Sequence, residues 1–195
     1  MKLHPCVVQS TLSGLKRKIL ELMQTQQVTD KETAENIKML KDHFGDKMFI
    51  GAGTVTSVSQ VELTKAAGGE FIISPDTDPE VIKKTKELEM VSMPGALTPS
   101  EIKIACKSGA DFVKLFPISS LGPDYVKAVK APLSNVKLLA VGGITENNMA
   151  DYLKSGVCGF GVGSNIVKMS MVDNDDYEGI TALAKKYVAI VGGNQ

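Results

Sequence analysis

The sequence predicts an α/β fold, a (β/α)8 barrel of the TIM type, formed by one domain over residues 1–195. Short apolar runs alternate along the chain with amphipathic stretches, and the centres of successive runs lie about 20 to 26 residues apart. This spacing fits one strand plus one returning helix, the repeat of a parallel sheet. The runs do not alternate strictly between apolar and polar residues, as is typical of strands covered on both faces.

Seven strands are expected. They are Ile19–Met23, Met48–Gly51, Phe71–Ser74, Met90–Met93, Phe112–Phe116, Lys137–Val141 and Gly159–Gly163. Residues 1–18 contain no clear strand, so the count is one short of a closed barrel. The length of the chain agrees with this missing strand, because the fold usually needs about 200 residues or more and this chain has 195. We therefore expect a barrel that is incomplete or irregular at its N-terminal strand.

Polar residues suited to begin helices precede the amphipathic stretches. The expected caps are Asp30 for a helix over 29–44, then Ser57, Asp78, Thr98 and Thr145. Pro79 and Pro99 stand at the first position of two of these helices, where the missing N–H costs nothing. Gly68, Gly109 and Gly156 follow helices at the position that favours a left-handed backbone, and we expect them to be caps without a ligand role.

Composition excludes several classes of function. The 22 Lys and Arg residues balance 22 Asp and Glu residues, which argues against a nucleic-acid partner. No apolar run approaches the roughly 18 residues of a membrane span, and the N-terminus has no signal-peptide pattern. The three cysteines are far apart and lack the spacing of metal ligands. We expect a cytoplasmic protein with no metal and no membrane association.

Lys114 is unusual because it interrupts the apolar strand Phe112–Phe116. Strand alternation places it on the face opposite Val113 and Leu115, and therefore toward the interior of the barrel. Desolvation there lowers the pKa of an amine and frees it to attack a carbonyl and form a Schiff base. An amine that reaches the barrel mouth and pairs with a carboxylate fits the pattern equally well.

Two glycine turns follow the last two predicted strands. One contains Gly142 and Gly143, and the other contains Gly163 and Ser164. Each is expected to lead directly into a helix, so that backbone N–H groups and the helix dipole favour an anion. Barrels often bind phosphate at this point, although simple tight turns would look the same.

Glu21 ends the first predicted strand. A carboxylate at the mouth of a barrel could move protons in a Schiff-base mechanism. The alternative is that Glu21 is an exposed glutamate on a helix beside Lys16, Arg17 and Lys18, without a catalytic role. The residues alone slightly favour this alternative.

Several motifs occur together, in order, from about residue 19 toward the C-terminus. They are Ile50–Val55, Phe71–Pro75, Met93–Gly95, Thr98–Ile102, Phe112–Pro117, Gly142–Ile144 and Gly161–Ser164. This set resembles the class I aldolases that cleave 2-keto-3-deoxy-6-phosphogluconate and 4-hydroxy-2-oxoglutarate. The resemblance implies a (β/α)8 barrel, commonly trimeric, that needs no metal or organic cofactor. It implies a keto-acid substrate that is cleaved to pyruvate and an aldehyde.

The resemblance also implies roles for particular residues. Lys114 matches the Schiff-base lysine, and Glu21 matches the acid/base that moves protons at the substrate. Thr54 matches the threonine near the keto-acid carboxylate, and Pro75 and Phe116 match residues that line the pocket. The two glycine turns, with Gly142, Gly143, Gly163 and Ser164, match the region that receives the distal phosphate.

Some positions depart from the family pattern. Residues 1–18 offer no counterpart of its first strand with an arginine, and residues 23–28 offer no basic residue after Glu21. Asp76 replaces the glycine of a typical Ser-Pro-Gly, and Ala140-Val141 replaces a typical Pro-Thr. Two further functions therefore stay open. One is a catalytically impaired barrel that binds a phosphorylated metabolite or acts as an assembly subunit; the other is a phosphate-binding isomerase or synthase.

Overall fold

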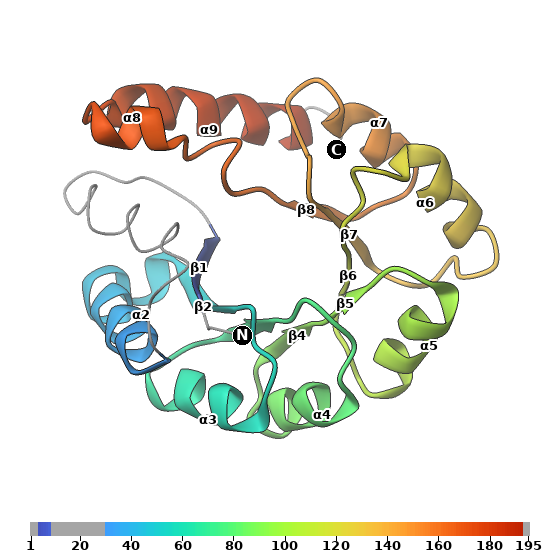
Figure 1. Cartoon of the computed structure of the whole chain (residues 1–195), viewed down its shortest axis with the longest axis horizontal. Coiled ribbons are helices and arrows are strands. Elements are labelled where there is room, and N and C mark those ends of the chain that lie inside the picture. The colour runs from blue at the N-terminus through green and yellow to red at the C-terminus, as the bar shows by residue number, and fades with distance from the viewer. Residues whose placement is uncertain (1–3, 9–29, 193–195) are drawn as a thin grey trace. The chain divides into compact units, whose positions relative to one another are not determined.

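The structure, a computed structural model, describes residues 4–8 and 30–192 (Figure 1). This part of the chain forms two compact units. Unit 1 contains residues 4–8 and 30–114, and unit 2 contains residues 115–192. The predicted first strand, Ile19–Met23, and Glu21 lie outside the described residues. That the whole chain acts as a single domain stays a prediction.

Unit 1 is a series of strands and helices in alternation. Its elements are β1 (His4–Val8), α2 (Asp30–Phe44), the 3-10 turn η1 (Gly45–Lys47), β2 (Phe49–Gly53), α3 (Val58–Ala66), β3 (Phe71–Ile73), α4 (Pro79–Glu87), β4 (Val91–Met93), β5 (Gly95–Ala96), α5 (Pro99–Lys107) and the start of β6 (Val113–Leu115). One sheet has the order β1-β2-β3-β4, and β2, β3 and β4 are parallel. Helices α2, α3 and α4 lie along the same side of this sheet (Figure 1).

Strand β1 corrects the expectation that residues 1–18 hold no strand. It pairs antiparallel with β2, with His4 opposite Gly53 and Val8 opposite Phe49. The run is only five residues long and includes Pro5, which has no N–H to donate and is therefore confined to edge strands. Such a short run gives a weak sequence signal. Its direction is opposite to that of β2, β3 and β4, which confirms that the N-terminal strand is irregular.

Three of the predicted helix caps are confirmed. The side chains of Ser57 and Asp78 accept hydrogen bonds from backbone N–H groups at the starts of α3 and α4. Thr98 and Glu101 form a reciprocal capping box at the start of α5. Asp30 is expected to stand just before the helix, but it is itself the first residue of α2. A difference of one position lies within the usual variation of helix ends.

The predicted C-terminal caps are confirmed as well. Gly68, Gly109 and Gly156 all have positive φ. Two following acidic residues hold strands in place. Glu70 accepts from the backbone N–H of Ile50 at 3.1 Å, and Asp111 accepts from that of Ser92 at 2.8 Å.

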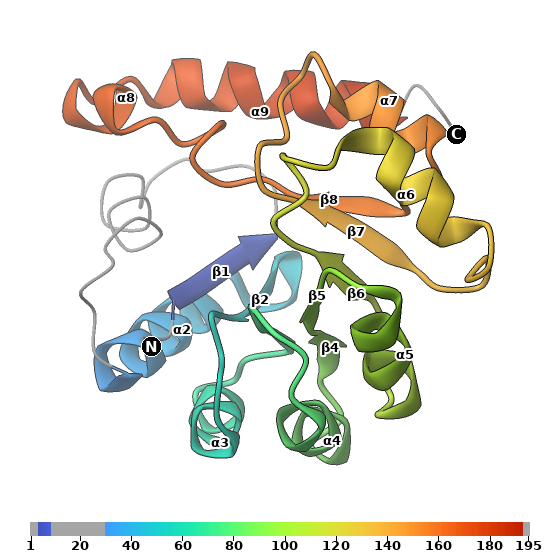
Figure 2. The ribbon, with the colours of Figure 1, turned by 45° about the vertical axis from the view of Figure 1, so that its right-hand side comes forward.

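Unit 2 begins with Leu115 at the end of β6. Its remaining elements are α6 (Gly122–Lys130), β7 (Leu138–Val141), α7 (Met149–Lys154), β8 (Gly159–Gly161), α8 (Met169–Asp173) and α9 (Tyr177–Gly192). Strands β7 and β8 lie side by side and are parallel, with Leu139 opposite Gly159 and Val141 opposite Gly161 (Figure 2). A small apolar cluster of Val167, Val172 and Ile180 joins α8 to α9.

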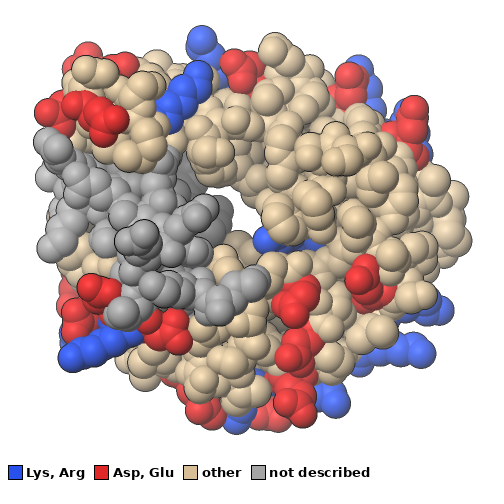
Figure 3. Space-filling model, viewed as in Figure 1, with Lys and Arg blue, Asp and Glu red and all other residues tan. Residues whose placement is uncertain are grey.

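The surface of the described residues carries both signs of charge. Acidic and basic side chains are interspersed over the face shown in Figure 3. Between residues 30 and 192, and in β1, no helix is both long and apolar enough to cross a membrane.

Candidate active site

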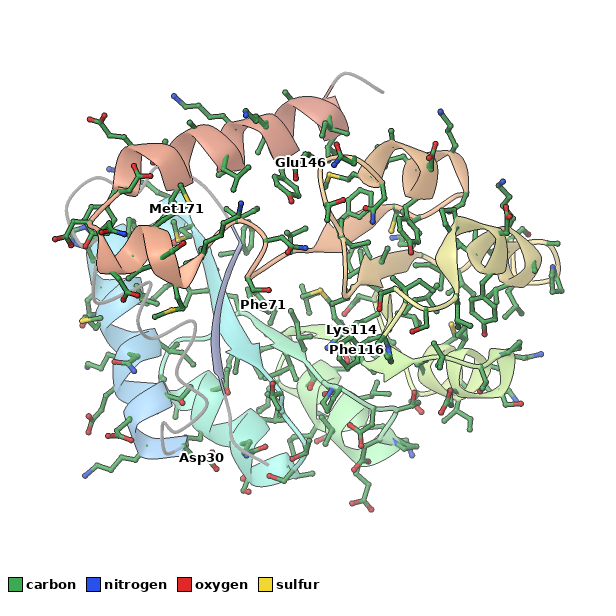
Figure 4. All side chains as sticks on the ribbon, turned by 45° about the horizontal axis from the view of Figure 1, so that its top comes forward. Asp30, Phe71, Lys114, Phe116, Glu146 and Met171 are labelled. Atoms are coloured by element: carbon green, nitrogen blue, oxygen red, sulfur yellow. The ribbon has the colours of Figure 1, made fainter. Side chains whose placement is uncertain are left out.

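Lys114 lies in the middle of the short strand β6 (Figure 4). Its neighbours Val113 and Leu115 are 1% and 0% exposed, whereas the Lys114 residue is half-buried. This pattern agrees with the predicted alternation, in which Val113 and Leu115 belong to the covered face. The backbone N–H of Lys114 donates to the carbonyl oxygen of Pro94 at 2.8 Å, and this bond fixes β6 against the segment that follows β4.

Thr54 and Pro75 also follow the carboxyl ends of strands in unit 1. Gly53 is opposite Ile73 in the parallel pair β2 and β3, so Thr54 and Pro75 leave the sheet at the same edge. The edge is tied together beyond the strands, because the N–H of Val55 donates to the carbonyl of Ile73 at 3.2 Å. Unit 1 therefore brings Thr54 and Pro75 to the carboxyl ends of the neighbouring strands β2 and β3, where parallel α/β folds carry their chemistry, and Lys114 lies within β6 of the same unit.

Pro75 is packed closely against Gly95. A Cβ atom at Gly95 would collide with the carbonyl oxygen of Pro75, so a larger residue would push the segments apart. The Thr77 hydroxyl donates to the carbonyl of Gly95 at 2.6 Å, and the N–H of Gly95 donates to the carbonyl of Asp76 at 3.1 Å. The loop after β3 is thus fixed in position by close packing, a backbone hydrogen bond and the Thr77 hydroxyl, none of which sequence patterns predict.

Thr54 has a left-handed backbone, with a φ of 62°. This conformation is a genuine outlier for a β-branched residue, and such strain gathers at functional sites. The loop that follows is held by Gln60, whose Oε1 accepts from the N–H of Thr56 at 2.8 Å. Gln60 is only 6% exposed and its Nε2 also reaches both carboxylate oxygens of Asp30 at 3.2 Å. Neither feature could be predicted from sequence patterns, because the first depends on backbone geometry and the second on a contact across 30 positions.

The two predicted glycine turns lie at one edge of unit 2. They follow β7 and β8 directly, and the last residues of these strands, Val141 and Gly161, are opposite each other. Gly142 and Gly143 have φ values of 97° and 69°. A Cβ atom at Gly143 would lie 2.6 Å from the Cβ of Ser119, so only glycine fits there.

Phe116 borders the first of these turns. Its ring lies 3.5 Å from the position that a Cβ at Gly142 would take. The Phe116 residue is 37% exposed, which leaves part of the ring accessible. The N–H of Ile118 donates to the carbonyl of Val141 at 3.1 Å and holds this segment beside the end of β7.

The expected helices do not begin at the glycine turns. Helix α7 begins only at Met149 and α8 only at Met169, and α8 has just five residues. After Gly163, the chain makes a single turn in which the N–H groups of Ile166 and Val167 both donate to the Gly163 carbonyl, at 2.9 and 3.0 Å. After the first turn, the side chain of Asn148 binds the local backbone at Gly143 and Thr145, and such bonds compete with helix formation. Any anion site at these turns must therefore rely on backbone N–H groups rather than on a helix dipole.

Glu146 lies in the loop between the first glycine turn and α7 (Figure 4). The hydroxyl of Tyr187 on α9 donates to its carboxylate at 3.0 Å. A hydrogen bond from its own backbone N–H, followed by that of Tyr187, lowers the pKa of Glu146. Desolvation is the largest cause that raises the pKa of Tyr187. Sequence reasoning missed this pair, whose members are 41 positions apart.

The described residues thus place the candidate residues in two sets. Unit 1 holds Thr54, Pro75 and Lys114, and unit 2 holds Phe116 with the glycine turns. Among His, Cys, Asp and Glu residues with described positions, no group of three or more could hold a metal ion.

Parallel β/α units with candidate residues at the carboxyl ends of their strands define a protein of the α/β barrel class. A protein-family model described as "KDPG and KHG aldolase" matches residues 13–183, and the chain belongs to this family. It is therefore an aldolase, a carbon–carbon lyase.

Comparisons with individual proteins support the same family. The chain is 41% identical over 147 residues to a "Probable 2-dehydro-3-deoxy-6-phosphogalactonate aldolase" of Rhizobium meliloti, a match that covers 75% of this chain and 69% of the relative. A solved structure described as "Native KDPGal structure" aligns with a TM-score of 0.74 and 35% identity, covering 83% of this chain and 78% of that one.

A second solved structure bears on the chemistry. The KDPG aldolase of Legionella pneumophila, with pyruvate captured as a covalent carbinolamine intermediate, aligns with a TM-score of 0.71 and 31% identity. The match covers 77% of this chain and 73% of that one. These likenesses confirm the predicted fold class, a TIM-type α/β barrel, and the antiparallel β1 is its irregular N-terminal strand.

Proposed function

We propose that this protein is a class I aldolase in which Lys114 forms a Schiff base with a 2-keto-3-deoxy sugar acid. The products are pyruvate and an aldehyde. The observation that carries the proposal is the position of Lys114, a half-buried lysine between two buried residues in the middle of the short strand β6. An amine in such a place has lost part of its hydration and is suited to nucleophilic attack on a carbonyl.

The reaction follows from the chemistry of the amine. Nζ of Lys114 attacks the C2 carbonyl carbon, and loss of water gives an iminium ion. The iminium withdraws the electron pair of the C3–C4 bond as this bond breaks, and the proton of the C4 hydroxyl leaves as the aldehyde forms. The resulting enamine is protonated at C3, and water releases pyruvate and the free amine. We assign the proton transfers to Glu21, which the family resemblance supports.

The substrate we favour is 2-dehydro-3-deoxy-6-phosphogalactonate. Support comes from the names of the Rhizobium meliloti relative and of the KDPGal structure. We propose that the glycine turns with Gly142, Gly143, Gly163 and Ser164 bind the phosphate through backbone N–H groups. We assign Thr54 to the keto-acid carboxylate, and Pro75 and Phe116 to the walls of the site. The strained backbone of Thr54 supports its role. The gluconate epimer and 4-hydroxy-2-oxoglutarate are the competing substrates to assay.

The deciding experiment is reduction with borohydride in the presence of pyruvate. The peptide that contains Lys114 is expected to gain the mass of a reduced pyruvyl adduct, and Lys114→Met is expected to lose it. Lys137→Met is the matched control, because Lys137 is an exposed lysine just before β7. An adduct that survives Lys114→Met contradicts the assignment. Binding of inorganic phosphate by a protein that neither forms the adduct nor cleaves any of the three substrates would instead identify an impaired barrel.

We also propose that the chain acts as a single aldolase-type domain over residues 1–195, that it forms a homotrimer, and that it works in the cytoplasm without a metal or cofactor. The family resemblance supports these assignments. Light scattering coupled to size-exclusion chromatography tests the trimer, and activity in the presence of a chelator tests the absence of a metal requirement.

A further inference from the structure

Two asparagine side chains bind the backbone of the glycine turn that follows β7. Nδ2 of Asn148 donates to the carbonyl oxygen of Gly143 at 2.9 Å, and its Oδ1 accepts from the N–H of Thr145 at 2.9 Å. Nδ2 of Asn165 donates to the carbonyl oxygen of Ile144 at 2.6 Å. Asn148 immediately precedes α7, whereas Asn165 belongs to the turn after β8.

These bonds fix two successive peptide planes. In a trans peptide the C=O and N–H groups point in opposite directions, so the N–H of Ile144 points away from the Gly143 carbonyl that Asn148 binds. The carbonyls of Gly143 and Ile144, which would repel an anion, are both occupied by amide donors. Within residues 30–192 the N–H groups of Gly143 and Ile144 donate no hydrogen bond, so they remain able to bind a ligand.

Asn165 differs from Asn148 because it connects the two glycine turns. It follows Ser164 directly in the chain, yet its side chain binds the other turn, 21 positions earlier. Strand pairing places the two turns at one edge of unit 2, and this bond fixes one turn relative to the other. Asn165 is half-buried, so solvent competes only partly for its amide.

We propose that Asn165 is a positioning residue for the phosphate group of the substrate. Its bond to the Ile144 carbonyl holds the two glycine turns in an arrangement in which N–H groups from both can bind one phosphate. Asn165 acts through Ile144 and the residue before it, Ser164, and does not itself transfer a proton. This inference rests on the proposed function and adds a residue that sequence patterns did not indicate.

The first test is Asn165→Ala, measured with a phosphorylated substrate and with the same sugar acid lacking its phosphate. Loss of the bond lets the turns move relative to each other and weakens a contact made equally in the ground and transition states. We expect KM for the phosphorylated substrate to rise about five- to tenfold. The value of kcat is expected to change by less than about twofold, since uniform binding affects KM alone. A loss of folded protein would instead lower the apparent kcat for both substrates.

The second test is Asn165→Asp, which keeps the size but replaces the donor with a carboxylate. Repulsion between this carboxylate, the Ile144 carbonyl and the phosphate is expected to raise KM for the phosphorylated substrate further, by about tenfold or more. The matched controls are Asn174→Ala and Asn174→Asp. Nδ2 of Asn174 also donates to a backbone carbonyl at 2.6 Å, that of Ser170, but at the end of α8 and away from both glycine turns. Neither control is expected to change KM.

Calorimetric titration with inorganic phosphate provides a readout independent of catalysis. Weaker phosphate binding by Asn165→Ala than by the wild type and by Asn174→Ala supports the inference. Equal phosphate binding by all three proteins, no phosphate binding by the wild type, or an equal rise of KM for both substrates overturns it. The proposed function is tested by a different experiment, because it fails if the wild type forms no pyruvate adduct at Lys114. In that case phosphate titration still decides the role of Asn165.

Discussion

Nζ of Lys86 on α4 lies 2.7 Å from the carboxylate of Asp111, just before β6. The same carboxylate accepts the backbone N–H of Ser92 in β4 at 2.8 Å, and the amine also donates to the carbonyl of Met90 at 3.2 Å. One ion pair thus connects a helix, a strand and the approach to the strand that carries Lys114.

The two partners are expected to contribute unequally to stability. Lys86→Met should lower the free energy of unfolding by no more than about 1 kcal/mol, because the pair is partly exposed. Asp111→Ala should cost about 1–3 kcal/mol, because the N–H of the buried Ser92 loses its acceptor. Urea unfolding measures both. Lys83→Met, an exposed position on the same helix, is the control, and an equal effect of Lys86→Met and Asp111→Ala would contradict this account.

Thr54→Gly is expected to separate stability from activity. Glycine adopts a φ of 62° without strain, and this relief offsets the extra freedom that glycine gives the unfolded chain. The free energy of unfolding should therefore not decrease by more than about 0.5 kcal/mol. Thr56→Gly, two positions later and without positive φ, should instead destabilise by about 0.5–1 kcal/mol. If Thr54 contacts the keto-acid carboxylate, Thr54→Gly should need a higher pyruvate concentration for half-maximal formation of the Lys114 adduct. Thr56→Gly should not. A strong destabilisation by Thr54→Gly would show that its side chain has a structural role.

Glu101 should make stability depend on pH at the acid end. Backbone N–H bonds from Leu97, then from Thr98, lower the pKa of Glu101 below its unfolded value near 4.5. A lowered pKa stabilises the fold above the unfolded value, and this contribution is lost as the pH falls through the folded value. Glu101→Gln should therefore flatten the decline of stability below about pH 4.5. The amide oxygen of glutamine can still accept the N–H bonds of the capping box, so the loss at pH 7 should stay below about 0.5 kcal/mol.

Comparison with Glu80→Gln, at an exposed position in the first turn of α4, isolates the capping effect. Denaturant unfolding at several pH values provides the measurement. Parallel pH profiles for wild type and Glu101→Gln would contradict the predicted role.

Tyr187 should make stability fall at alkaline pH. Desolvation, followed by its bond to Glu146, raises the pKa of this phenol above 10.0. The folded state therefore keeps the proton longer than the unfolded state, and stability falls as the pH rises from the unfolded pKa through the folded one. Tyr187→Phe should remove this part of the decline. Tyr177→Phe is the control on the same helix, since the Tyr177 hydroxyl bonds the exposed Asp175. Identical alkaline profiles for wild type and Tyr187→Phe would refute the prediction.

The strands and helices could be predicted because their signals are local. Apolar runs located β2, β3, β4, β6, β7 and β8 to within a few residues, and the chemistry of Ser57, Asp78 and Thr98 marked helix starts correctly. The helices after the glycine turns begin later than expected, and at the first turn the side chain of Asn148 binds the local backbone instead. The strand β1 escaped notice because five residues with a proline resemble a loop.

The order of β/α units, the family and the lysine most suited to a Schiff base can all be predicted from the amino-acid sequence, because periodicity and motifs are properties of neighbouring residues. The antiparallel direction of β1, the strained backbone of Thr54 and the bond from Asn165 to Ile144 are seen only in the folded chain. Each of these depends on where the chain returns in space. A hydrogen bond between residues 21 positions apart leaves no pattern in the residues that lie between them.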